Sequence, residues 1–299
     1  MGFLEKRNPA TITGPFLGSE AIGDQWLNRR QLRSPLFTQL FHNVYTPAAM
    51  QITHELRCRG AACLAPATAT ITGCSAAAVY GFEFAAAYDP VEVIVAEQEK
   101  FTAKRGIHIR RCTLGPAEGV PWRGVQLAGP LRTTLDILCN TKLRRSLPRT
   151  VGYLDALLRA GFVDHDELEL FLRRRHDPGI VRARRALALA NPLAESVPES
   201  EVRVWLTLDG LEPKSQIEVH DAFGAFLGRL DLGYPECKLA VEYDGKWHAT
   251  PEQAQYDARR RATLRAHSWE FVIITQEWLR DDPRGMVQAV RDARSRRLP

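Results

Sequence analysis

Long apolar runs are absent from this 299-residue chain. A helix that crosses a bilayer needs roughly 18 consecutive apolar residues, and no run in the sequence approaches that length. The N-terminus places Glu5, Lys6 and Arg7 ahead of Asn8 and Pro9, and it has no apolar signal core. We therefore expect a cytoplasmic protein without a membrane partner.

Paired cysteines are also missing. No Cys-x-x-Cys motif is present, and no histidine stands at zinc-finger spacing from a cysteine. We expect buried free thiols rather than disulfides or a zinc site. The six cysteines are scattered at positions 58, 63, 74, 112, 139 and 237.

A strong excess of one charge is absent too, as are internal repeats and low-complexity tracts. The formal charge of +5 and the pI near 9.0 permit an anionic partner such as nucleic acid, but a solvated basic surface gives the same balance. With 45% hydrophobic and 25% charged residues, the composition is that of a globular protein. The length predicts two or three domains, and the composition excludes whole-chain disorder.

What the sequence does contain is a pair of apolar-rich stretches, 226–233 and 238–244, that flank Pro235 and Glu236. Runs of this length around a proline turn are typical of two antiparallel strands. The sequence therefore predicts a β-hairpin in this region.

The second strand of this hairpin separates acidic from apolar side chains. Glu242 and Asp244 are two residues apart, so they project from the same face of a strand. The opposite face is assigned to the core and carries Leu239, Val241 and Tyr243.

On the first strand, Asp231 lies between Leu230 and Leu232, which we expect to share the core face. A register that brings Asp231 beside Glu242 buries both apolar sets together. Two adjacent anions repel each other, and a divalent cation is the simplest remedy. The hairpin therefore predicts a metal site.

The elements around the hairpin follow a recognisable order. A helix begins near Ser196, which is placed to cap it, with Pro198 and two glutamates in its first turn. After the three predicted strands come another helix, a fourth strand and a final helix. The order α, three strands, α, β is that of the restriction-endonuclease-like core. The further segments are the strand 215–220, the turn 221–224, the helix 251–267, the strand 269–275 and the helix from residue 277.

Residues 196–292, roughly a third of the chain, resemble the Vsr-like branch of the PD-(D/E)XK nuclease superfamily. This branch contains the very-short-patch-repair endonucleases and actinobacterial endonuclease-domain proteins. The residues that carry the resemblance are Glu199, Gln216, Asp231, Glu242, Asp244, His248, Asp257, Arg260, Leu264 and Trp269.

Asp231 and Glu242 are the metal ligands in this interpretation. Their carboxylates are hard oxygen donors that suit Mg²⁺ or Mn²⁺, and such an ion binds the scissile phosphate and lowers the pKa of an attacking water. The alternative is a pair of surface acids.

Asp244 stands where the superfamily usually has a lysine. An acid does not stabilise developing negative charge as lysine does, so Asp244 is expected to orient His248 or a metal-bound water. The resemblance implies that His248 is the general base or the leaving-group acid, and an ordinary surface histidine is the alternative. Lys246 either restores the missing positive charge or is simply solvated.

The resemblance assigns further residues around this centre. Glu199 points toward the metal in that family, although an acid that complements the helix dipole is equally consistent with its position. Gln216 either binds a phosphate or is an exposed strand amide. Ser268 replaces the glycine that usually precedes Trp269. The following helix carries a basic run, of which we expect two members to face the DNA backbone and the others to pair with Asp257 or water. The run consists of Arg259, Arg260, Arg261 and Arg265.

Near the N-terminus, residues 18–34 hold two short helical patterns, and Pro35 closes the second. An extended run follows from Leu36 to Tyr45. Two helices followed by a ribbon are the order of a winged helix-turn-helix.

This segment resembles the N-terminal winged helix of the AbiEi-type antitoxin superfamily, which binds operator DNA. In that comparison the arginines contact phosphate or guanine and the glutamine contacts a base edge. A solvated basic helix face is the alternative. The residues concerned are Arg29, Arg30, Gln31 and Arg33.

The middle of the chain shows no catalytic constellation. We expect a helix at 72–84, a buried strand at 90–96, an extended segment at 107–112, a helix that begins at Pro130 and further helices at 153–160, 164–175 and 182–190. In the first of these later helices, Arg132 and Asp136 are four residues apart and are expected to pair.

The predicted fold class is therefore a multidomain protein with mixed α+β and α/β structure. It comprises a winged helix at 1–70, an α+β middle region with a helical connector at 71–190, and a nuclease-like domain at 191–299. The expected function is Mg²⁺-dependent hydrolysis of phosphodiester bonds in DNA, with RNA as a substrate that the residues do not exclude. The alternative is a non-catalytic DNA-binding regulator of AbiEi type, for which a homodimer and a cognate toxin are the expected partners.

Overall fold

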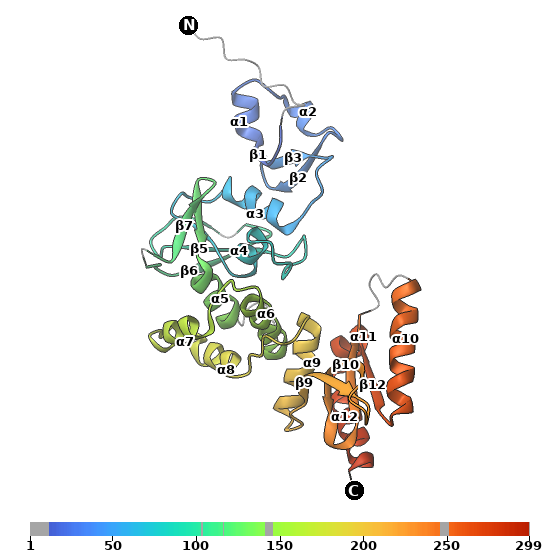
Figure 1. The fold of residues 1–299 in the computed structure, drawn as a ribbon. Coiled ribbons are helices and arrows are strands. Elements are labelled where there is room, and N and C mark those ends of the chain that lie inside the picture. Colours follow the sequence, from blue (N-terminus) through green and yellow to red (C-terminus); the bar gives the residue numbers. More distant parts are fainter. Residues whose placement is uncertain (1–11, 103, 116, 141–145, 246–250, 299) are drawn as a thin grey trace. The chain divides into compact units, whose positions relative to one another are not determined.

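The computed structural model describes residues 12–102, 104–115, 117–140, 146–245 and 251–298 (Figure 1). The chain divides into two compact units, an N-terminal unit, Met1–Ile137, and a C-terminal unit, Leu138–Pro299. Both contain helices and sheets, which confirms the prediction of a multidomain protein with mixed α and β structure. The three-part division at residues 70 and 190 stays a prediction.

The N-terminal unit begins with two short helices and a small sheet. Helix α1 (Gly18–Gly23) and helix α2 (Arg29–Leu32) precede the ribbon of β2 (Phe37–Phe41) and β3 (Val44–Pro47). Strand β1 (Phe16–Leu17) completes a sheet of order β1-β3-β2. The predicted order of two helices followed by a ribbon is confirmed.

A five-stranded sheet of order β6-β5-β4-β8-β7 forms the rest of this unit. Strand β5, which lies between β6 and β4, is buried at all five positions, as its run of Val and Ile predicts. The elements are α3 (His54–Ala62), β4 (Thr70–Ile71), α4 (Gly73–Val79), β5 (Val91–Val95), β6 (Ile107–Arg111), β7 (Gly119–Trp122), β8 (Val125–Ala128) and α5 (Pro130–Cys139).

The helix predicted at 72–84 is too long by five residues at its C-terminal end. Helix α4 ends at Val79, and Tyr80 caps it through backbone hydrogen bonds. Gly81 follows with a φ of 94°, in the left-handed region where a helix does not continue. Phe82 and Phe84 continue the apolar pattern of the helix, so the prediction ran past the true helix end at Val79.

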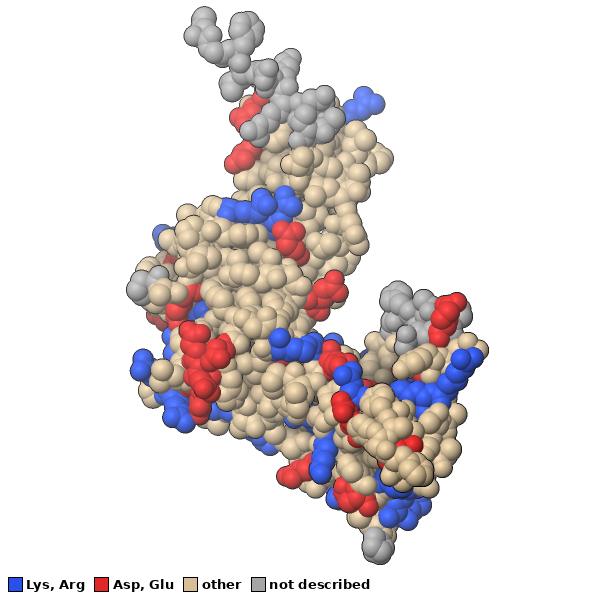
Figure 2. Space-filling view, viewed as in Figure 1, with Lys and Arg blue, Asp and Glu red and all other residues tan. Residues whose placement is uncertain are grey.

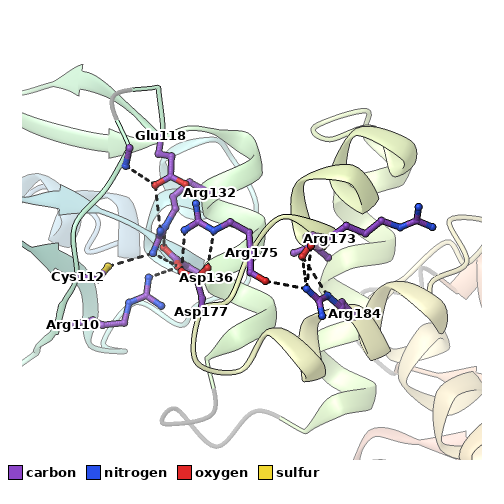
Figure 3. A network of polar contacts seen from close by, with 11 residues as sticks. Arg110, Cys112, Glu118, Arg132, Asp136, Arg173, Arg175, Asp177 and Arg184 are labelled. Carbon is purple, nitrogen blue, oxygen red and sulfur yellow. Dashed lines mark hydrogen bonds and ion pairs between the residues drawn. The ribbon is translucent and has the colours of Figure 1, made fainter.

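The predicted pair of Arg132 and Asp136 is confirmed, and it belongs to a buried cluster (Figure 3). The Asp136 carboxylate accepts hydrogen bonds from Arg132 Nε at 2.9 Å and Arg132 Nη2 at 2.8 Å. Arg110 and Thr72 also donate to this carboxylate. Only 2% of Asp136 and 2% of Arg132 is exposed, so one acid is held by two arginines inside the protein.

In the C-terminal unit, α6 (Leu147–Arg159) packs against α9 (Val197–Leu208). Buried Asp155 accepts a hydrogen bond from Arg203 at 2.9 Å and thereby ties the two helices together. Ser196 caps α9 as predicted, by accepting from the Glu199 amide. Two further helices pack in this unit, namely α7 (His165–Arg173) and α8 (Ile180–Ala188).

A four-stranded sheet of order β12-β11-β10-β9 follows. Strand β10 is antiparallel to both of its neighbours, whereas β11 and β12 are parallel. The predicted order α, three strands, α, β is confirmed. The elements are β9 (Lys214–His220), β10 (Phe226–Tyr234), the 3₁₀ turn η2 (Pro235–Cys237), β11 (Leu239–Asp244), α10 (Pro251–Ala266), β12 (Glu270–Thr275), α11 (Gln276–Asp281) and α12 (Pro283–Arg297).

Helices cover both faces of this sheet. On one face, Leu239 and Val241 of β11 join a core with residues of α9 and α12. On the other face, Ala240 joins Leu264 of α10 and Trp269 in a smaller core. In the part of the chain that the structure describes, no helix combines the length and apolar character that a bilayer crossing requires.

Helix α10 ends in a Schellman motif. The Ser268 amide donates to the Arg265 carbonyl at 2.9 Å, and the Trp269 amide donates to the Leu264 carbonyl at 3.1 Å. Ser268 has a φ of 69°, so it occupies the left-handed position at which glycine is preferred. The packing of Trp269 against Leu264 supplies the apolar contact that accompanies this motif.

Candidate active site

The hairpin of β10 and β11 has the predicted register. Leu232 lies opposite Val241, and Gly233 lies opposite Ala240. One step further along the ladder, Asp231 corresponds to Glu242. The two acids of the predicted site therefore lie on neighbouring strands of one sheet.

The assignment of Leu230 and Leu232 to one core face is wrong. Leu232 joins the core on the side of α9 and α12, whereas Leu230 joins the core on the side of α10. Side-chain alternation therefore inverts at Asp231. The opposite residue of β9 is Gln216, whose φ of 52° is left-handed, so both strands depart from regular geometry at this step.

Asp231 sits in an anionic environment. The pKa of its carboxyl group is raised to about 7. Burial is the largest cause, and the neighbouring carboxylates of Glu199 and Glu242 act in the same direction, whereas Arg260 lowers the pKa. Among the residues that the structure describes, this acid therefore lies close to other negative charges without enough positive charge to balance them. Such an environment favours the binding of a cation.

Glu199 lies in the first turn of α9 and contributes to this field, but it also has local partners. Its carboxylate accepts from Ser196 Oγ at 2.8 Å and from the Glu195 amide at 3.0 Å. These contacts place Glu199 in the N-terminal cap of α9, where an acid also complements the helix dipole, as the alternative interpretation expects. Glu199 thus combines a capping role with proximity to Asp231.

Glu242 is buried, with 1% of the residue exposed, and each carboxylate oxygen has an arginine partner. Arg260 Nη1 donates to Oε1 at 2.8 Å, and Arg261 Nε donates to Oε2 at 2.9 Å. We call Arg260 and Arg261 the arginine pair. The sequence predicted that two arginines of α10 would face DNA and that others would pair with Asp257 or water. Arg260 does lie 3.8 Å from Asp257, but the contact of the arginine pair with Glu242 was not predicted.

Gln216 is the half-buried residue opposite Asp231. Within the described residues, neither its side-chain nitrogen nor its side-chain oxygen has a hydrogen-bond partner, although both atoms are shielded from solvent. Buried amides normally have partners, so an unpartnered amide beside an uncompensated acid is a feature of a site that binds something.

The remaining predicted residues lie at the end of β11. Asp244 is half-buried and opposite Thr275 of β12. Lys246 and His248 fall outside the described residues, so their assigned roles stay predictions.

The donor set of this site suits a divalent cation in part. Asp231 and Glu199 provide carboxylate oxygens in an anionic environment, which is what Mg²⁺ requires. Glu242 provides a third carboxylate, but the arginine pair holds it. Among the described residues, no three His, Cys, Asp or Glu side chains are already arranged to hold a metal ion.

The basic residues predicted for DNA binding in the N-terminal unit lie on or next to α2. All four are exposed, as both the DNA-binding interpretation and the solvated-face alternative require. Gln31 also completes a capping box, because its Oε1 accepts from the Asn28 amide at 2.8 Å. The four residues are Arg29, Arg30, Gln31 and Arg33.

The comparisons with known proteins name no function. No family model matches the chain, and no solved structure matches it significantly. Two curated proteins of Mycobacterium tuberculosis, one from strain CDC 1551 and one from strain H37Rv, are each 32% identical to it over 181 residues. The match covers 60% of this chain and 61% of each relative, and both relatives are called uncharacterized proteins. The chain is thus similar to mycobacterial proteins over less than two thirds of their length.

Proposed function

We propose that the C-terminal unit is a Mg²⁺-dependent endonuclease that hydrolyses phosphodiester bonds in DNA, and that the N-terminal winged helix holds the DNA. The observation that carries this proposal is the environment of Asp231, where burial and two neighbouring carboxylates raise its pKa to about 7. A fold that keeps such an acid without compensation retains a place for a cation.

In this proposal Asp231, Glu242 and Glu199 would hold the metal ion. When bound, the ion supplies a Lewis acid for the phosphate and lowers the pKa of the attacking water. Arg260 contacts the phosphate backbone, and the unpartnered amide of Gln216 donates to a phosphate oxygen. Asp244 orients His248, which moves the proton, and Lys246 adds positive charge.

A plasmid-nicking assay tests the proposal. The full-length chain is incubated with supercoiled, mismatched and single-stranded DNA in Mg²⁺, in Mn²⁺ and in EDTA. We expect cleavage only with a divalent ion, and a loss of at least about 100-fold in Asp231→Asn, because metal ligands contribute more than the 10–100-fold of their supporting partners.

The matched control is Glu218→Gln. Glu218 is an exposed acid of the same sheet, on β9, so its replacement removes the same charge away from the site. Activity equal to that of the wild type is expected for this variant. Cleavage that persists in EDTA, or that is equal in the wild type and Asp231→Asn, would overturn the proposal.

A second candidate function is a non-catalytic DNA-binding regulator of antitoxin type. The observation in its favour is the arginine pair, which already neutralises Glu242, together with the acid at position 244. In that case the Asp231→Ala, Glu242→Ala double variant binds operator DNA as tightly as the wild type, and neither protein cleaves it. A gel-shift titration against genomic fragments distinguishes the two functions.

A further inference from the structure

The arginine pair closes over an acid that the proposed function needs. Arg260 and Arg261 each donate one hydrogen bond, at 2.8 and 2.9 Å, to separate oxygens of Glu242. The Glu242 side chain is 2% exposed, whereas those of Arg260 and Arg261 are 17% and 23% exposed. The acid is therefore inside the protein, and its two partners reach it from the surface side.

This arrangement opposes metal binding at Glu242. Both Glu242 oxygens already accept a hydrogen bond from a guanidinium group, and the positive charge of these two groups repels a cation that would take the same oxygens. An arginine never loses its proton at ordinary pH, so it cannot reduce this repulsion by becoming neutral. The Glu242 carboxylate can bind a metal ion only when Arg260 or Arg261 leaves it and binds another anion.

A phosphodiester is the anion that best replaces the carboxylate. The guanidinium group binds carboxylate and phosphate oxygens with the same planar geometry. Both arginines lie on α10, where Arg259 and Arg265 are also exposed, and basic side chains are visible over this helix (Figure 2). A nucleic-acid backbone along this helix would therefore compete directly with Glu242 for the arginine pair.

We infer that the arginine pair exchanges partners. It binds Glu242 when no nucleic acid is present and binds a DNA phosphate when the substrate arrives, which frees Glu242 for the metal ion. This inference rests on the proposed function and adds its regulation. DNA and metal ion then bind cooperatively, and by linkage each raises the affinity for the other by the same factor.

Fluorescence anisotropy of a labelled duplex DNA measures this coupling. The full-length chain is titrated into the duplex in EDTA and in Ca²⁺, a hard cation that prefers the same oxygen ligands as Mg²⁺. A gel confirms that the duplex stays intact. We expect Ca²⁺ to tighten DNA binding by the wild type by on the order of tenfold, within the usual range of coupling between two sites.

Glu242→Gln separates the exchange from a simple structural ion pair. Without the competing carboxylate, the arginine pair is free for phosphate, so this variant is expected to bind DNA in EDTA about fivefold more tightly than the wild type. The effect of Ca²⁺ should largely vanish. A purely structural ion pair would leave DNA affinity in EDTA unchanged or lower it.

Arg260→Gln is the second variant, with Arg259→Gln as its matched control. Both remove one positive charge from α10, but the structure gives Arg259 no bond to Glu242 within the described residues. Arg260→Gln should cut the effect of Ca²⁺ to about twofold or less, whereas Arg259→Gln should weaken DNA binding and keep that effect. Arg261→Gln, which retains the bond between Arg260 and Glu242, replaces Arg260→Gln if the latter unfolds.

The outcomes separate this inference from the proposed function. If the wild type cleaves DNA with Mg²⁺ but Ca²⁺ tightens DNA binding equally in the wild type and in Arg260→Gln, the partner exchange is wrong and the nuclease proposal is retained. If coupling follows the expected pattern but no cleavage occurs, the exchange stands and the nuclease proposal falls. Unchanged DNA affinity of a folded Glu242→Gln variant would also overturn the exchange.

Discussion

Asp136 in the N-terminal unit and Asp231 in the C-terminal unit are both acids with arginine neighbours, but neighbouring groups balance their negative charges to different extents. Asp136 accepts two hydrogen bonds from Arg132 and further bonds from Arg110 and Thr72. Asp231 has two carboxylates among its strongest neighbours, and its pKa rises to about 7. Neighbouring side chains thus balance the negative charge of Asp136, whereas the residues that the structure describes do not balance that of Asp231.

Glu242 makes the contrast sharper because it lies beside Asp231. Its two oxygens are held by Arg260 and Arg261, so a compensated and an uncompensated acid stand side by side in one sheet. Compensation alone identifies a structural ion pair, as at Asp136. The combination of both states on neighbouring strands is typical of a site whose partners change when a ligand binds.

The largest expected effect is a loss of stability when Arg132, which binds the buried carboxylate of Asp136, is replaced. Arg132→Ala leaves the buried carboxylate of Asp136 without its main partner, so we expect the free energy of unfolding of the N-terminal unit to fall by about 3–5 kcal/mol. Urea unfolding followed by circular dichroism measures this loss.

Arg173→Ala is the matched control for that loss. Arg173 and Glu169 lie on α7 of the C-terminal unit and form an ion pair whose side chains are 70% and 43% exposed, so its removal should change the free energy of unfolding of that unit by less than about 0.5 kcal/mol. Equal effects of the two substitutions would contradict the assignment of Asp136 as a compensated buried acid.

The second expected effect is smaller than that of Arg132→Ala, and it is a gain in the free energy of unfolding instead of a loss. Folding raises the pKa of Asp231 from 3.8 to about 7, so the folded state binds the proton more tightly than the unfolded state. This contribution to stability is fully present below pH 4 and is lost as the pH rises to 7. Asp231→Asn removes the charge, and we expect it to raise the free energy of unfolding by about 2 kcal/mol at pH 8.

Urea titrations of the wild type and Asp231→Asn at pH 4 and pH 8 test this expectation. The difference between the two proteins should be small at pH 4 and large at pH 8. Added Mg²⁺ should reduce the difference at pH 8, because an ion that binds only the folded wild type stabilises it. A pH-independent difference would mean that Asp231 is not the uncompensated acid.

The smallest effect concerns the helix that carries the arginine pair. Ser268 has a left-handed backbone at the end of α10, so Ser268→Gly should raise the free energy of unfolding by about 0.5–1 kcal/mol. Ser268→Ala should give no such gain, because alanine has the same steric restriction. If Ser268→Gly also altered the pH dependence assigned to Asp231, the helix end and the acid would be coupled, and the two regions could not be compared independently.

Local patterns predicted much of this fold. The alternation of residues 239–244 gave the correct faces of β11, and the four-residue spacing of Arg132 and Asp136 gave their ion pair. The order of helices and strands in the C-terminal unit and the cap at Ser196 were also predicted. Each of these features depends on residues that are close in sequence.

The contacts that give the site its character could not be predicted in the same way. Glu242 and its arginine partners are 18 and 19 residues apart, and their contact depends on how α10 packs against the sheet. The inversion of faces at Asp231 violates the period of two on which strand prediction rests. The positive φ of Gln216 gave no warning, because neither glycine nor asparagine occupies that position.

The paired irregularity at Gln216 and Asp231 has a consequence for the fidelity of strand pairing. Regular antiparallel strands keep their apolar faces when they slip by two residues, so burial alone does not forbid that error. Here alternation inverts at Asp231 in β10, and the residue opposite it in β9, Gln216, has a left-handed φ. A slip of two residues would move these two irregular positions out of alignment. The irregularity therefore acts as a register lock that fixes Asp231 opposite Gln216.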